Sequence, residues 1–102
     1  MSRSGNSLKL KHKGQEAVLS LEPEDFDAIR KIATSCVAKL GSVEKEWYHD
    51  FAGDRGWIQV TSEDTGEVSL EIHRSVGREA SVNFVVDDKG AAIAIVRSLI
   101  KI

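Results

Sequence analysis

The sequence predicts an α+β fold: a two-layer sandwich in which two helices pack on one face of an antiparallel sheet, in the order β-β-α-β-β-β-β-α. Three observations predict it. Apolar residues recur at helical spacing after Pro23, alternate with polar residues on both sides of that segment, and return to helical spacing near the chain end. Alternating segments joined by short turns must pair antiparallel, and the apolar face of such a sheet needs a covering layer.

A hairpin and a helix are predicted first along the chain. Apolar residues alternate over 8–12 and again over 17–21, and the residues 13–16 between them have turn chemistry. Pro23 suits the first position of a helix, and Gly41 is well placed to end it. Between them the apolar residues fall at spacings of three and four, which predicts one buried stripe made of Phe26, Ile29, Ile32, Ala33, Cys36, Val37 and Leu40.

Four further strands and a closing helix are predicted after Gly41. Alternation over 47–51, 57–61, 68–72 and 82–86, with turn residues between, predicts a meander. Asp87 or Asp88 can then cap a helix that runs to the chain end. The inward side of the meander is expected to hold Val60, Val68, Leu70, Ile72, Val82, Phe84 and Val86.

The composition predicts one globular domain. Apolar residues make up 41% of the 102 residues, charged residues make up 29%, and the formal net charge is −2. We expect residues 1–6 to be a disordered N-terminal tail and residues 7–102 to form a single α+β domain. The single Cys36 cannot close an intrachain disulfide, and no apolar signal segment or membrane span is visible. A cytoplasmic location and no membrane partner are therefore expected.

The closing helix carries apolar residues around more of its circumference than one buried stripe requires. One interpretation is a homodimer interface, for which the candidate residues are Ile95, Leu99 and Ile102. The other is deep insertion between the sheet and the first helix. A domain of this length buries a modest share of its surface, which favours association, so a homodimer is expected.

The outward face of the meander is a candidate site. Its alternating positions would carry aromatic, histidine, amide and carboxylate side chains, and the candidates are Tyr48, Asp50, Trp57, Glu71, His73 and Asn83. Such a set could bind a polar ligand or partner, or support acid-base chemistry if burial shifted a pKa. The alternative is an ordinary solvated face, which antiparallel sheets often have.

A second candidate site lies on the inward side. If Trp47 and Phe51 point inward, His49 between them does too, and with Phe84 these residues could line a cavity between the sheet and the first helix. The alternative for His49 is a buried side chain satisfied by a hydrogen bond. No metal is expected, since the three histidines and one cysteine show no ligand spacing, and no cofactor motif is present.

These observations favour a small non-enzymatic binding or regulatory module that forms a homodimer through its C-terminal helix. One alternative is a protein that binds a small apolar molecule in the inward cavity. A second is nucleic-acid binding through the basic hairpin that carries Lys9, Lys11 and Lys13, although lysines on an edge strand also prevent aggregation, and we expect no nucleic-acid partner. An enzyme is the least supported class, because spacing assembles no nucleophile-base pair and no catalytic residue is assigned.

Overall fold

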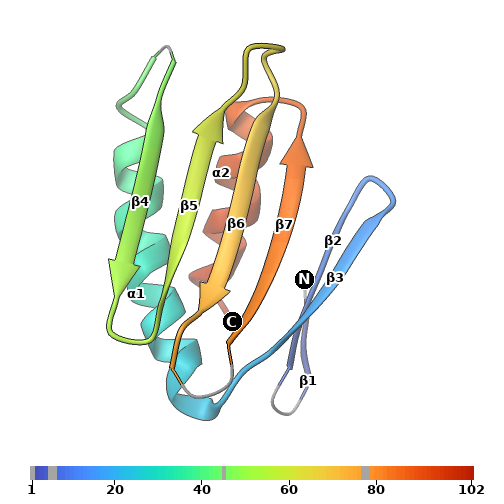
Figure 1. The fold of residues 1–102 in the computed structure, drawn as a ribbon, viewed down its shortest axis with the longest axis vertical. Helices are drawn as coiled ribbons and strands as arrows, with labels where there is room; N and C mark the ends of the chain where they lie inside the picture. Colours follow the sequence, from blue (N-terminus) through green and yellow to red (C-terminus); the bar gives the residue numbers. More distant parts are fainter. Residues whose placement is uncertain (1, 5–6, 45, 77–78) are drawn as a thin grey trace.

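The computed structural model describes residues 2–4, 7–44, 46–76 and 79–102, and its layers are those predicted (Figure 1). Two helices lie behind a four-stranded sheet, and a smaller sheet stands beside it. The α+β sandwich is therefore confirmed, with one short strand added in front of the predicted order. The elements are β1 Ser2–Ser4, β2 Ser7–His12, β3 Gln15–Ser20, α1 Pro23–Leu40, β4 Tyr48–Gly53, β5 Gly56–Ser62, β6 Val68–Arg74, β7 Ala80–Val86 and α2 Lys89–Leu99.

The larger sheet is an antiparallel meander in the order β4-β5-β6-β7. Its strands pair without a bulge: Ile58 lies opposite Ile72, and Leu70 lies opposite Phe84. Buried and more exposed residues alternate along β5, β6 and β7, because successive side chains point to opposite faces. All seven residues predicted to point inward are buried.

The smaller sheet holds the predicted hairpin, in the order β1-β2-β3. Lys13 and Gly14 form its two-residue turn with φ of 43° and 83°, the pair of positive angles that matches the twist of a tight hairpin. Ser2–Ser4 pairs with residues 7–9, so part of the segment expected to be a disordered tail is an edge strand. Positions 1, 5 and 6 of that segment lie outside the described residues.

The hairpin closes one end of the core beside β7. Its leucines point inward, with Leu8 and Leu10 on β2 and Leu19 on β3, each at most 1% exposed. The side-chain amide of Gln15 donates to the Val85 carbonyl at 2.8 Å and accepts from the Val85 N–H at 3.3 Å. This amide pairs with the free edge of β7 as a neighbouring strand would, and so it ties the two sheets together.

An ion cluster anchors the start of α1. Asp25 is 1% exposed and accepts from the Glu22 backbone N–H at 2.7 Å. Its carboxylate accepts from Arg55 Nε at 2.5 Å, and Arg74 Nε lies 3.1 Å from its other oxygen. Glu22 pairs with both guanidinium groups, at 2.9 Å and 3.0 Å. The cluster therefore joins α1 to the β4–β5 turn and to the end of β6.

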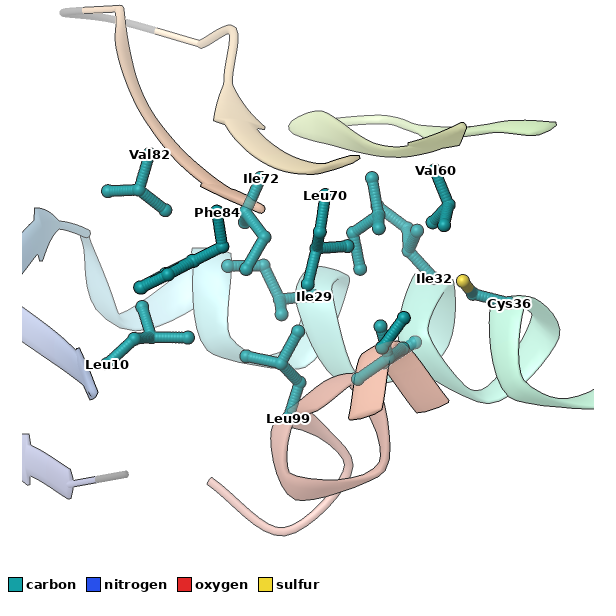
Figure 2. Packing of buried hydrophobic residues seen from close by; sticks show 14 of the residues in the cluster. Leu10, Ile29, Ile32, Cys36, Val60, Leu70, Ile72, Val82, Phe84 and Leu99 are labelled. Carbon is teal, nitrogen blue, oxygen red and sulfur yellow. The ribbon is translucent and has the colours of Figure 1, made fainter. Parts of the chain in front are cut away.

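The core lies between the large sheet, the two helices and the hairpin (Figure 2). Leu70 and Ile72 of the sheet point toward Ile29 and Ile32 of α1, and Leu99 of α2 points into the same space. Asp88 caps α2 by accepting from the Ala91 N–H at 2.8 Å, which decides between the two predicted caps. A fully buried leucine contributes about 1.5–3 kcal/mol relative to an exposed one. Packing in this core therefore stabilises the large sheet, both helices and the hairpin together.

Candidate functional site

The face of the large sheet that points away from the helices is not covered by any described element, and we call it the open face (Figure 1). The strand register puts on it the side chains that alternate with the core residues. All six residues predicted for this face lie on it. Its members are Tyr48, Asp50, Ala52, Trp57, Gln59, Thr61, Ser69, Glu71, His73, Ser81, Asn83 and Val85.

An aromatic stack forms one end of the open face. Trp57 on β5 lies directly opposite His73 on β6, and their rings stack with centroids 3.7 Å apart and planes within 7°. The His73 side chain is only 14% exposed, and its Nε2 has no hydrogen-bond partner among the described residues. Its Nδ1 lies 4.0 Å from a Glu71 carboxylate oxygen. The stack therefore places two parallel aromatic rings beside a carboxylate.

The rest of the open face is polar and carries negative charge. The side-chain amide of Gln59 donates to the hydroxyl of Tyr48, and Tyr48 is 55% exposed. Asp50 is exposed next to Gln59 on the neighbouring strand, and Glu71 is half-buried on the other side of Gln59. None of the strand residues that the structure places on this face is a lysine or an arginine.

One large apolar residue on this face was not among the sequence candidates. Val85 on β7 is 47% exposed, two positions beyond Asn83 on the same face. Alternation from Val82, Phe84 and Val86 already predicts its outward direction. Its exposure is unusual for a large apolar side chain, and alternation alone does not predict it.

The residues expected to line an inward cavity are split between two places. Trp47, His49 and Phe51 form a half-buried row on or beside edge strand β4, with ring centroids 6.1 Å and 5.9 Å apart. Phe84 lies on β7 at the opposite edge of the sheet, where it is 2% exposed and packs near Leu10 of the hairpin (Figure 2). Two strands, β5 and β6, therefore lie between the row on β4 and Phe84.

The candidate interface residues of α2 differ in burial. Leu99 is 0% exposed within a single chain, where it packs in the core. Ile95 and Ile102 are half-buried. The helix α2 packs against α1 and also contacts β6 and β7. Many of its apolar side chains are therefore buried, fully or in part, within the domain itself.

The lysines of the hairpin lie beside carboxylates. Lys9 Nζ lies 2.9 Å from Glu16 and Lys11 Nζ 3.9 Å, and Lys13 pairs with Asp87. The hydrogen bond from Lys9 lowers the pKa of Glu16, and the one from Lys13 lowers the pKa of Asp87. Lys9 and Lys11 share the one carboxylate of Glu16, so these exposed pairs offset only part of the positive charge that a phosphate track would need.

No family model, curated protein or solved structure matches this chain. Neither α1 nor α2 is both long and apolar enough to span a membrane, within the part of the chain that the structure describes. Across residues 2–4, 7–44, 46–76 and 79–102, no three His, Cys, Asp or Glu side chains gather as a metal site would require.

Proposed function

We propose that this protein is a non-enzymatic binding module whose open face binds a cationic segment of another protein. The observation that carries the proposal is the combination on one uncovered sheet face of a stacked aromatic pair, Trp57 and His73, with two carboxylates and no lysine or arginine. The aromatic, amide and carboxylate groups of the face are of the kinds that recognise a partner.

Each part of the open face fits a cationic partner. Arginine and lysine bind well over the face of a tryptophan, and the stack on His73 holds the Trp57 ring in place, so little side-chain freedom is lost on binding. Asp50 and Glu71 supply the opposite charge on either side of Gln59. Tyr48 and Val85 add exposed contact area at the two edges of the face.

The proposal is tested with a peptide of alternating glycine and arginine, followed by tryptophan fluorescence. The variant Trp47→Phe leaves Trp57 as the single tryptophan, so the signal reports on the open face. We expect the arginine peptide to change this emission in a saturable way. Its affinity should weaken as salt rises, because exposed charges are screened beyond about 10 Å at 0.1 M ionic strength.

Charge-neutral variants show whether the open face is responsible. Asp50→Asn and Glu71→Gln should each weaken the affinity for the arginine peptide about two- to fivefold, as expected for partly exposed charge pairs. Glu24→Gln removes the same charge from an exposed position on α1, in the other layer, and should leave the affinity unchanged. Equal effects of all three variants, or equal binding of a glutamate peptide, would contradict the proposal.

Self-association through α2 is a separate part of the proposal. What supports it is the half-buried state of Ile95 and Ile102, together with the small size of the domain. Light scattering over a wide concentration range checks it: we expect a dimer that Ile102→Lys converts to a monomer, and a wild-type monomer at every concentration would contradict self-association.

A cytoplasmic location also stays a proposal, supported by a single buried cysteine.

A further inference from the structure

The outer edge of β4 is a free strand edge. β4 is the first strand in the order β4-β5-β6-β7, and no strand among residues 2–4, 7–44, 46–76 and 79–102 pairs with its other side (Figure 1). The opposite edge of the sheet differs, because the Gln15 amide bonds the Val85 backbone there. Natural sheets protect exposed edges with lysine, proline or a bulge, and β4 has none of these. One edge of the sheet is therefore open to a further strand.

Every second residue of β4 directs its backbone groups outward. The Ser62 N–H donates to the Trp47 carbonyl at 3.0 Å, so Trp47 and Ser62 form a hydrogen-bonded pair. Such pairs alternate with non-bonded pairs along an antiparallel ladder, so the register gives the same inward role to His49 and Phe51. The backbone N–H and C=O groups that point away from β5 therefore belong to the residues that alternate with these: Tyr48, Asp50 and Ala52.

The two sides of this edge favour different side chains in an added strand. On the side of the open face lie Asp50, which is exposed, and Ala52, which is small and lies opposite Trp57. A long cationic side chain opposite Ala52 can therefore reach across it toward the Trp57 ring, and one opposite Asp50 faces its carboxylate. On the inward side, the half-buried row from Trp47 to Phe51 offers aromatic surface to apolar side chains.

The charge around this edge favours a cationic partner over a second copy of the chain. Residues 46–54 carry the carboxylates of Glu46, Asp50 and Asp54 and neither a lysine nor an arginine. All three acids are exposed, and none forms an ion pair with another described residue. A second β4 would bring the same carboxylates to the edge without a cation to pair them, and like charges on adjacent strands are destabilising.

We propose that the cationic segment adds to the sheet as a further strand, antiparallel to β4, with cationic and apolar residues in alternation. This inference rests on the proposed function of the open face and specifies its partner. In this mode of recognition, backbone hydrogen bonds to the edge supply affinity and alternating side chains supply specificity. The cationic residues lie opposite Tyr48, Asp50 and Ala52, so their own N–H groups are the ones that bond β4. The apolar residues direct their N–H groups away from β4.

The test compares three peptides of alternating arginine and valine, each as long as β4, in calorimetric titrations of the wild-type protein. One peptide is unmodified, one is N-methylated at every arginine, and one is N-methylated at every valine. Methylation at arginine removes the donors that bond β4, so we expect binding to weaken about tenfold or more. Methylation at valine alters groups that point away from β4 and should change the affinity little. Equal affinities of the two methylated peptides, or a greater loss from methylation at valine, would overturn the proposal.

Amide hydrogen exchange shows where the peptide pairs. The unmodified peptide should slow exchange of the outward amides of Tyr48, Asp50 and Ala52, because each gains a hydrogen bond. The amides of His49 and Phe51 already bond β5 and should change little. Unchanged exchange of the outward amides at saturating peptide would contradict strand addition. Exchange that slows at these amides as the concentration of protein alone rises would place a second copy on the edge and overturn the proposal.

The variant Ala52→Pro blocks the edge within the protein itself. Proline is tolerated on an edge strand where its missing N–H would face solvent, so β4 should still pair with β5. We expect about tenfold weaker binding of the unmodified peptide, since the edge loses a donor and meets the proline ring. The control Ala52→Ser keeps the N–H and should bind as wild type does. Undiminished binding by a folded Ala52→Pro protein would count against the proposal.

The emission of Trp57 separates failure of strand addition from failure of the proposed function. If the two methylated peptides bind equally and still change this emission, the open face binds cationic segments without a new strand, and only the strand addition fails. If neither the glycine-arginine peptide nor the unmodified arginine-valine peptide changes the emission, both proposals fail.

Discussion

Asp25 is the residue whose environment departs most from that of an ordinary surface acid. It is 1% exposed, with two arginine side chains and one backbone N–H directed at its carboxylate. Removing one partner from a buried ion pair leaves the other charges uncompensated, at a cost of about 3–5 kcal/mol. Asp25→Ala should therefore lower the free energy of unfolding in urea by about 3 kcal/mol or more.

Asp27 provides the matched control for that substitution. It lies two residues away on α1, is exposed, and pairs with Arg30 on the same helix. An exposed pair of this kind contributes about 0–1 kcal/mol. Asp27→Ala should change the urea midpoint little, and equal losses from Asp25→Ala and Asp27→Ala would contradict the structural role of the ion cluster.

Cys36 is predicted to be chemically inert in the folded protein. Burial raises the pKa of its thiol from 9.0 to about 12, so almost no reactive thiolate forms near neutral pH. Alkylation by iodoacetamide at pH 8 should be slow in buffer and fast in concentrated urea. Fast alkylation of the folded protein would show that the thiol is accessible.

The same pKa shift predicts how stability depends on pH. Between pH 9 and about 12 the unfolded chain loses the thiol proton while the folded chain keeps it, so the unfolded state is favoured as pH rises. The free energy of unfolding should therefore fall over this range more steeply in wild type than in Cys36→Ala. Parallel pH curves for the two proteins would rule out the burial of this thiol.

At the level of elements, the pairing of β5 with β6 depends on Gly56. A Cβ at this position would lie 2.0 Å from the His73 backbone carbonyl, and strand backbones cannot move apart without losing their ladder. Gly56→Ala should lower the free energy of unfolding by about 2 kcal/mol or more, as overpacking does. It should also disturb the Trp57–His73 stack, which near-ultraviolet circular dichroism can follow.

Gly41 provides the control for Gly56. The sequence predicts it as the residue that ends α1, because glycine is common just after a helix. It follows α1 as expected, but its φ of −64° is right-handed, and a Cβ there would meet nothing closer than 3.5 Å. Gly41→Ala should therefore be tolerated. If it destabilises the protein as much as Gly56→Ala does, the close approach at β5 and β6 is not the cause.

Periodicity in the sequence predicts most of the elements and which side of each is buried. The stripe from Phe26 to Leu40 and the alternation through Val82, Phe84 and Val86 both correspond to buried faces. It does not predict that the hairpin forms a sheet of its own or that Ser2–Ser4 adds a strand. Those features depend on pairing between segments, which spacing along one segment does not encode.

At the level of the whole molecule, the candidate site was predictable in part. Alternation places Trp57, Glu71 and His73 on one face, but only the register of β5 against β6 puts Trp57 directly opposite His73. The free edge of β4 could not be predicted, because spacing does not show that the hairpin lies beside β7 and not beside β4. The same strand order places β5 and β6 between the row on β4 and Phe84.

We propose that the open face of the four-stranded sheet is the surface that binds the cationic segment. The most direct measurement is a map of backbone amide NMR shifts in the labelled protein during titration with the arginine peptide. We expect the largest shifts on β5 and β6, around Trp57, Glu71 and His73. Shifts concentrated on the hairpin or on α2, with these strands unchanged, would contradict it.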